Sequence, residues 1–163
     1  MVNKELIFQK DIANKRIFVS RFFDAPKTNV WRAWTKSELL DIWWAPKPWK
    51  AITKSLDFSE GGHWLYRMQG PDGTAMWSRA DYEKIDAENY FIVRNAFCDE
   101  NGNVNPELPR MRWKNVFTAI GDTTMVEIQI QCDREEDLKK IIEMGFEEGF
   151  TSGLQNLEDM LVG

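Results

Sequence analysis

Hydrophobic side chains recur with two different periods along the chain, and each period predicts its own kind of element. Residues 16–24 are rich in β-branched and aromatic side chains and are expected to form a strand that Ala25-Pro26 ends. Val30, Trp31 and Trp34 then share one face of a short helix, in which Pro26 suits the first turn. The first part of the chain is therefore predicted to be a strand followed by a helix.

A second short helix is predicted by Thr35-Lys36-Ser37-Glu38, which has the spacing of a capping box. Alternating polar and apolar residues then predict strands over residues 52–58, 63–69, 76–85, 90–97, 110–120 and 123–131. Short turns between them, such as Gly70-Pro71-Asp72-Gly73, favour antiparallel pairing of neighbours. Residues 1–15 are expected to be an N-terminal arm or an edge strand.

The C-terminal segment has the clearest helical period, and we expect one long helix over residues 134–161 with Asp133 as its N-cap. Its apolar stripe consists of Leu138, Ile141, Ile142, Phe146, Phe150, Leu154, Leu157 and Leu161. Gly145, Gly149 and Gly153 lie beside this stripe, and each costs the helix ~1 kcal/mol relative to alanine. Such a line of glycines either packs closely on a sheet or leaves room for a ligand, and both interpretations stay open.

This order of elements predicts a single α+β domain over residues 1–163. A curved antiparallel sheet of six to seven strands would wrap around the long C-terminal helix, with two short helices after the first strand. A strongly twisted sheet contacts a straight helix at some points and leaves a gap at others. We therefore expect a cavity of roughly 300–1,000 Å³ between sheet and helix, the usual size of a small-molecule site.

Charge and composition narrow the range of partners. The chain of 163 residues has a net charge of −5 and no basic run, which disfavours nucleic-acid binding. We expect no membrane span and no signal peptide, because no stretch is long and apolar enough. The two cysteines, Cys98 and Cys132, suit a reducing, cytoplasmic location with free thiols, although one disulfide stays open.

Few residues of the chain are candidates for catalysis or metal binding. His63 is the only histidine, and strand alternation places it on the face opposite Trp64, Tyr66 and Met68. With one histidine and two distant cysteines no familiar zinc site can be assembled, and we expect neither a metal nor another cofactor. Carboxylates are numerous, but the sequence pairs no two of them for acid–base catalysis, so enzymatic activity stays open.

Aromatic residues are the most distinctive chemistry of the chain. Eight tryptophans and ten phenylalanines exceed the needs of a plain core, and such side chains bind apolar or planar molecules. Arg79 and Arg94 lie within expected strands and are either polar anchors of an apolar pocket or solvated residues. The candidate ligand-binding residues are Trp43, Trp44, Trp49, Trp64, Tyr66, Met68, Trp77, Arg79, Arg94, Trp113, Phe117, Met144, Gly149, Phe150 and Gly153.

The segment Trp44-Ala45-Pro46-Lys47-Pro48-Trp49 is expected to be an irregular loop, because its two prolines remove backbone donors. Large apolar groups on such a loop form either a lid that opens over a pocket or a plug that closes the end of the core. The sequence leaves both roles open.

Three segments, in order, resemble one superfamily. The first is Phe23-Asp24-Ala25-Pro26 with Val30-Trp31 and Trp43-Trp44-Ala45-Pro46, the second is Gly61-Gly62 with the hairpin up to Gly73, and the third is Glu147-Glu148-Gly149-Phe150. Together they are similar to the SRPBCC (START, birch-pollen-allergen-like) superfamily over residues 16–161. Within it, the chain most resembles the branch named after the activator of the heat-shock chaperone ATPase.

The resemblance implies a helix-grip fold with a deep pocket between sheet and long helix for a hydrophobic or aromatic small molecule. It implies no single activity, because fold alone does not assign function. Three hypotheses follow: a binding protein for such a molecule, an enzyme of cyclase or hydrolase type acting in the cavity, and a chaperone-interaction module of the stress response. A homodimer is also left open.

Overall fold

An antiparallel sheet is the framework of the molecule, and the computed structural model describes residues 6–162 of the chain. The strands are β1 (Ile7–Asp11), β2 (Arg16–Phe23), β3 (Lys50–Leu56), β4 (His63–Gln69), β5 (Ala75–Asp86), β6 (Tyr90–Cys98), β7 (Met111–Ile120) and β8 (Thr123–Cys132). They pair in the order β1-β2-β8-β7-β6-β5-β4-β3. Strands β3 to β8 therefore follow one another across the sheet, and the N-terminal pair is added beside β8.

The sheet has more strands than the sequence pattern predicted. Six to seven were expected, and the described residues form eight, because the segment from Ile7 pairs with β2 as an edge strand. Ile7 lies opposite Ser20 and Asp11 lies opposite Arg16. The part of the expected arm over residues 1–5 lies outside the described residues. The two short helices consequently follow the second strand rather than the first.

The expected single C-terminal helix is two helices. The helices of the described chain are α1 (Lys27–Thr35), α2 (Ser37–Trp43), α3 (Glu135–Glu143) and α4 (Phe146–Val162). The break lies at Gly145, whose φ of +83° is left-handed and whose N–H donates to the Ile142 carbonyl (3.1 Å). Glycine commonly ends helices in this conformation because any Cβ would be strained there. Gly145 therefore terminates α3 and is no part of a line of small residues along one helix.

The predicted helix caps are also wrong. Lys36 precedes α2 and Arg134 precedes α3 as N-cap residues, and neither makes a side-chain capping hydrogen bond. The hydroxyl of Thr35 instead donates to the Trp31 carbonyl within α1 (2.9 Å). Asp133, which was expected to cap the C-terminal helix, contacts Arg94. The helix positions are thus set by packing rather than by caps.

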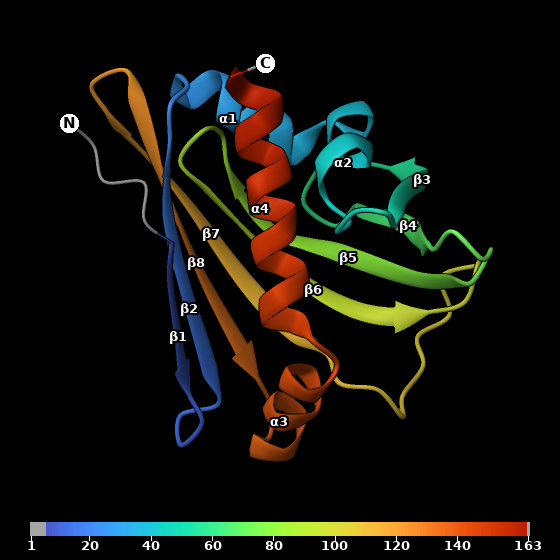
Figure 1. Cartoon of the computed structure of the whole chain (residues 1–163). Helices are drawn as coiled ribbons and strands as arrows, with labels where there is room; N and C mark the ends of the chain where they lie inside the picture. The colour runs from blue at the N-terminus through green and yellow to red at the C-terminus, as the bar shows by residue number, and fades with distance from the viewer. Residues whose placement is uncertain (1–5, 163) are drawn as a thin grey trace.

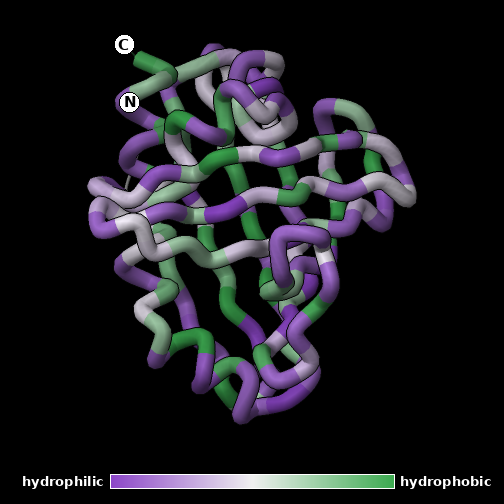
Figure 2. The backbone as a smooth tube through the Cα atoms, turned by 90° about the vertical axis from the view of Figure 1, so that its right-hand side faces the viewer, coloured by the Kyte–Doolittle hydropathy of each residue, from purple (hydrophilic) through white to green (hydrophobic). Residues whose placement is uncertain are grey.

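Helix α4 crosses the concave face of the sheet, with α1 and α2 near its C-terminal end and α3 at its N-terminal end (Figure 1). Hydrophobic and hydrophilic positions alternate along the strands (Figure 2), as burial of one face requires. Val126, Ile128 and Ile130 of β8 and Leu154 and Leu157 of α4 are at most 1% exposed. The core therefore lies between α4 and the sheet, which is a helix-grip arrangement. Within residues 6–162 no helix has the length and hydrophobicity needed to cross a bilayer.

Gly149 and Gly153 lie one turn apart on α4 but meet different surroundings. A Cβ on Gly153 would lie 3.1 Å from the backbone oxygen of Trp44 and 3.4 Å from that of Trp43. A Cβ on Gly149 would meet only Cγ of Pro46, at an ordinary contact distance of 3.8 Å. Gly153 is therefore required for close packing of α4 on the segment that leaves α2, whereas Gly149 borders free space.

Alanine substitutions separate these two roles. We expect Gly153→Ala to lower the free energy of unfolding by about 1–3 kcal/mol, because the added methyl group presses on backbone atoms. Gly149→Ala should raise it by roughly 0.5–1 kcal/mol, because alanine favours the helix and has room there. Urea unfolding followed by circular dichroism measures both values, and equal effects at the two sites would contradict the difference in packing.

Candidate functional site

Two neighbouring cavities lie between the sheet and the elements that cover its concave face. The larger, here called the outer pocket, has a volume of about 380 Å³, and the smaller, the inner cavity, has about 30 Å³. Trp44, Tyr66, Asn95 and Trp113 line both and form the wall between them. The outer pocket is further lined by Pro46, Trp49, Met68, Met76, Ser78, Phe97, Met111, Ile141, Met144, Gly145, Phe146, Gly149 and Phe150.

Strand register brings the floor of the outer pocket together. Tyr66 lies opposite Ser78 and Met68 lies opposite Met76, and alternation along the strands turns all four side chains to the same face. Met76 and Met144 are 40% and 41% exposed, so they lie where the pocket meets solvent. The lining residues include no Asp, Glu, Lys, Arg or His. The outer pocket is thus a mostly apolar hollow with a few neutral polar groups.

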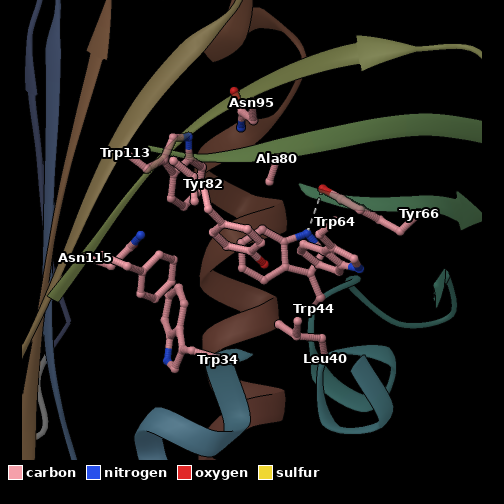
Figure 3. A pocket seen from close by; sticks show the side chains of 12 residues that line it. Trp34, Leu40, Trp44, Trp64, Tyr66, Ala80, Tyr82, Asn95, Trp113 and Asn115 are labelled. Carbon is pink, nitrogen blue, oxygen red and sulfur yellow. Dashed lines mark hydrogen bonds between the residues drawn. The ribbon is translucent and has the colours of Figure 1, made fainter. Parts of the chain in front are cut away.

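The indole of Trp44 is the centre of the wall between the cavities. Its Nε1–H donates to Tyr66 Oη (3.0 Å), the bond drawn as a dashed line in Figure 3. Its ring centroid lies 5.2–6.0 Å from those of five other aromatic rings, which belong to Trp34, Trp43, Trp64, Trp113 and Phe150. Tilted and edge-to-face contacts of this kind fix the plane of the indole.

Tyr66 supplies the polar partner of Trp44. Its ring stacks on that of Trp64 with centroids 3.8 Å apart, and its hydroxyl also shares a hydrogen bond with Ser78. Burial raises the pKa of Tyr66 to about 12, and burial likewise raises the pKa of Tyr82 on the inner cavity. Both phenols are therefore protonated and uncharged at neutral pH.

The inner cavity lies inside the aromatic core and has polar groups in its wall (Figure 3). Asn115 is 1% exposed, and its Oδ1 has no hydrogen-bond partner among residues 6–162. The Nε1 atoms of Trp34 and Trp113 are likewise buried without partners in the described part of the chain. Each such group costs about 1–3 kcal/mol when it stays unpaired. A space of about 30 Å³ is large enough for a water molecule or for the polar end of a larger guest.

Most of the candidates predicted from the sequence line these cavities. They are Trp44, Trp49, Trp64, Tyr66, Met68, Trp113, Met144, Gly149 and Phe150. The other candidates, which line neither cavity, are Trp43, Trp77, Arg79, Arg94, Phe117 and Gly153.

Neither predicted arginine anchor lies in a cavity. Arg79 pairs with Asp81 (Nη2 to Oδ1, 2.6 Å) and donates to the Gly102 carbonyl (2.7 Å). Arg94 reaches Asp133, with 3.4 Å between Nη2 and Oδ2. Both occupy strand positions that alternate with cavity-lining residues, so the pleat turns them to the opposite face of the sheet. Their predicted role as pocket anchors was wrong, and the alternative of partly solvated sheet residues holds.

The three aromatic candidates that line no cavity have structural surroundings. Trp77 lies on the outer face, with the Arg67 guanidinium 5.6 Å from its ring centroid. Trp43 is fully buried, and its Nε1–H donates to the Ala33 carbonyl (2.9 Å). Phe117 is 2% exposed and packs on the Trp31 and Trp34 rings. Trp43 and Phe117 therefore fill the core.

The loop after α2 lies beside the outer pocket. Trp43, the last residue of α2, is fully buried in the core, whereas Trp44 and Trp49 of the loop line the outer pocket. Asn156 of α4 donates through Nδ2 to the carbonyl of Ala45 (3.0 Å), which ties the loop to the helix. Opening of this loop as a lid stays a prediction.

Sequence reasoning missed the polar lining residues Ser78, Asn95 and Asn115. All three occupy inward positions of strands, and Asn115 follows Trp113 by two residues on the same face. Asparagine is depleted in strands. Its occurrence at inward positions beside aromatic residues was the signal that could have identified a polar part of the cavity.

Metal ligands and nucleophiles are not gathered at the cavities. Within residues 6–162 no group of three or more His, Cys, Asp or Glu side chains could hold a metal ion. His63 is half-buried at the start of β4, on the face opposite Trp64. Cys98 and Cys132 are free thiols, and burial raises the pKa of Cys132 to about 11. Cys132 is therefore a poor nucleophile at neutral pH.

The raised pKa of Tyr66 predicts a loss of stability at alkaline pH. The phenol ionises near pH 10 in the unfolded chain and near pH 12 in the folded protein, so the unfolded state releases this proton first. Stability therefore falls as the pH rises from 10 to 12, by about 2 kcal/mol from this group. We expect Tyr66→Phe to lose that much less over the same window in urea unfolding. An unchanged pH dependence in Tyr66→Phe would contradict the assignment.

The chain matches known proteins over most of its length. Residues 24–162 match the model of the family described as "Activator of Hsp90 ATPase homolog 1-like protein". None of the curated proteins compared with the chain matches it. A solution NMR structure of a protein from Arthrobacter aurescens is 28% identical, with a TM-score of 0.90 over 96% of this chain and 91% of that one. A crystal structure of a protein from Mycobacterium smegmatis is 25% identical, with a TM-score of 0.88 over 96% and 97%.

At lower identity the likeness concerns the fold alone. The crystal structure of the AHSA1 protein from Silicibacter pomeroyi is 16% identical, with a TM-score of 0.72 over 90% of this chain and 97% of that one. The family match begins directly after β2 and ends with α4, so it includes the elements that form both cavities. The chain therefore belongs to the family of activator of Hsp90 ATPase homolog 1-like proteins.

Proposed function

We propose that the protein binds a hydrophobic or aromatic small molecule in the outer pocket. The observation that carries this proposal is the unfilled space of about 380 Å³ between the concave face of the sheet and the elements that cover it. Small-molecule sites are typically about 300–1,000 Å³ in volume and are lined by apolar and aromatic side chains with a few polar groups. The lining of the outer pocket has this composition.

The side chains around the pocket favour planar ligands. Trp49, Trp113 and Phe150 offer flat apolar surfaces, and Met68, Met76 and Met144 offer flexible ones that adapt to different shapes. A two-ring aromatic molecule that buries about 200 Å² gains roughly 5 kcal/mol from leaving water. That gain corresponds to a dissociation constant of about 0.2 mM before other contacts and costs are counted.

The alternative of a cyclase or hydrolase has weaker support. Such an enzyme needs an ionisable group that faces its substrate with a pKa suited to proton transfer. Among the described residues, the titratable side chains that line the cavities are Tyr66 and Tyr82, and burial raises the pKa of both. Protonated phenols serve as hydrogen-bond partners, and they are poor general bases near neutral pH. Binding is therefore the better-supported function.

A chaperone-interaction module is the second candidate, and the name of the matching family is the specific reason for it. Such a module would act through its outer surface, where Ile42 is 58% exposed. Adding the protein to an Hsp90 chaperone and measuring ATP hydrolysis separates the two functions. A concentration-dependent increase in the ATPase rate would favour the chaperone role over small-molecule binding. A cytoplasmic location, a link to the stress response and a homodimer remain predictions.

Filling the outer pocket tests the proposed binding. Gly149→Leu places a side chain in the space beside Pro46, and we expect it to weaken binding of the neutral dye N-phenyl-1-naphthylamine at least tenfold. Titration of the dye fluorescence measures the dissociation constant, and circular dichroism checks the fold. The matched control is Gln155→Leu, which adds the same side chain to an exposed position of the same helix.

The control and His63→Ala should both bind the dye as the wild type does, because neither position lines a cavity. Two results would overturn the proposal. One is a wild-type protein that binds no dye, and the other is equal binding by the wild type and a folded Gly149→Leu variant.

A further inference from the structure

A side-chain amide at the junction of the two cavities presents a hydrogen-bond donor that no group of the described chain accepts. The N–H of Met111 donates to Asn95 Oδ1 (3.0 Å), and this bond fixes which way the amide is turned. Its nitrogen, Nδ2, therefore lies on the side that faces Trp113 and Ala80, as Figure 3 shows. Among the described residues Nδ2 has no acceptor. Asn95 lines both cavities, so this donor is available to a guest in either.

Trp113 provides a second donor at the same junction. Its Nε1–H is buried and finds no partner within residues 6–162, and its ring also lines both cavities. Asn95 pairs with Met111 in the β6–β7 register, and Trp113 lies two residues farther along β7 on the same face. Such diagonal neighbours lie roughly 7–8 Å apart, within reach of a large side chain. Both donors therefore belong to residues that line the junction of the two cavities.

The same cavities offer no counter-charge to a charged guest. Their lining residues include no Asp, Glu, Lys, Arg or His, and the phenols of Tyr66 and Tyr82 are protonated. A carboxylate or an ammonium group would lose its hydration without gaining a counter-charge, which is costly in an apolar site. A neutral oxygen loses far less hydration and gains two donors.

Resting on the proposed function, we infer that the site selects uncharged aromatic molecules that carry a hydrogen-bond-accepting oxygen. Asn95 Nδ2–H and Trp113 Nε1–H hold that oxygen at the junction of the two cavities, while the rings of the guest occupy the outer pocket. These hydrogen bonds pair the Trp113 indole N–H, which has no partner within the described part of the chain.

Three probes of nearly equal shape test this selectivity. They are 2-acetylnaphthalene, which has a neutral acceptor, 2-isopropenylnaphthalene, in which a CH₂ group replaces the carbonyl oxygen, and 2-naphthoate, which is charged at pH 8. Quenching of tryptophan fluorescence measures the three dissociation constants. We expect the ketone to bind at least as tightly as the hydrocarbon, despite its better hydration, and the naphthoate to bind at least tenfold more weakly than either.

Substitutions then assign the effect to the two donors. Trp113→Phe removes the indole N–H, and Asn95→Asp keeps the acceptor for the Met111 N–H but removes the amide donor. Each should weaken binding of the ketone about three- to tenfold more than binding of the hydrocarbon. The matched control is Trp64→Phe, because the Trp64 N–H already donates to Thr53 Oγ1 (2.9 Å). Trp64→Phe should leave the ratio of the two dissociation constants unchanged.

The outcomes distinguish this inference from the function on which it rests. Binding of both neutral probes with an unchanged ketone-to-hydrocarbon ratio in Trp113→Phe and Asn95→Asp would overturn the donor pair and leave the proposed function intact. Naphthoate binding as tight as ketone binding would overturn the exclusion of charge. Absence of binding by both neutral probes to the wild type would overturn the proposed function itself. Using two independent variants keeps the test valid if one of them fails to fold.

Discussion

The close approach of α4 to the backbone of Trp43 and Trp44 determines where the molecule is filled and where it is hollow. Gly153 permits this contact, because a Cβ there would lie 3.1 Å from the Trp44 carbonyl oxygen. With the backbone held against the helix, the Trp44 indole lies among five aromatic rings and bonds Tyr66. One side of Trp44 therefore faces the aromatic core and its small inner cavity. On the other side, past Gly149, the helix is not in close contact and the outer pocket remains.

Neutral polar groups and charged groups occupy different places in this fold. Arg79 and Asp81 pair on the outer face, where water is near and a salt bridge costs little to maintain. Inside, Asn95, Asn115 and Trp113 carry neutral donors and acceptors, several of them unpaired. A buried unpaired neutral group costs about 1–3 kcal/mol, whereas a buried lone charge costs far more. The core can therefore hold a few unpaired neutral groups, and it holds them in the walls of the two cavities.

The match to the activator of Hsp90 ATPase homolog 1-like family includes the elements that form the site. It does not identify the molecule that the site binds. Structures that are 28% and 25% identical share the fold with TM-scores of 0.90 and 0.88. A fold of this kind provides a scaffold, and its function depends on the side chains that face the hollow. For this chain those side chains are aromatic, sulfur-containing and neutral polar, which is why small-molecule binding has more support than catalysis.

The sequence by itself determined strands β2 to β8, the antiparallel pairing of neighbours from β3 to β8 and the inward face of β4, because alternation and glycine-containing turns are local properties. It also indicated that Trp44, Tyr66 and Trp113 belong with a cavity. The tertiary structure decided the features that the local sequence pattern does not specify. The apolar stripe runs unbroken through Gly145, so only the left-handed backbone there divides the helix. Whether a glycine leaves space depends on what approaches it, and that separates Gly149 from Gly153. The inward position of Asn95 beside Trp113 depends on the pairing of β6 with β7, a contact between segments distant in the chain.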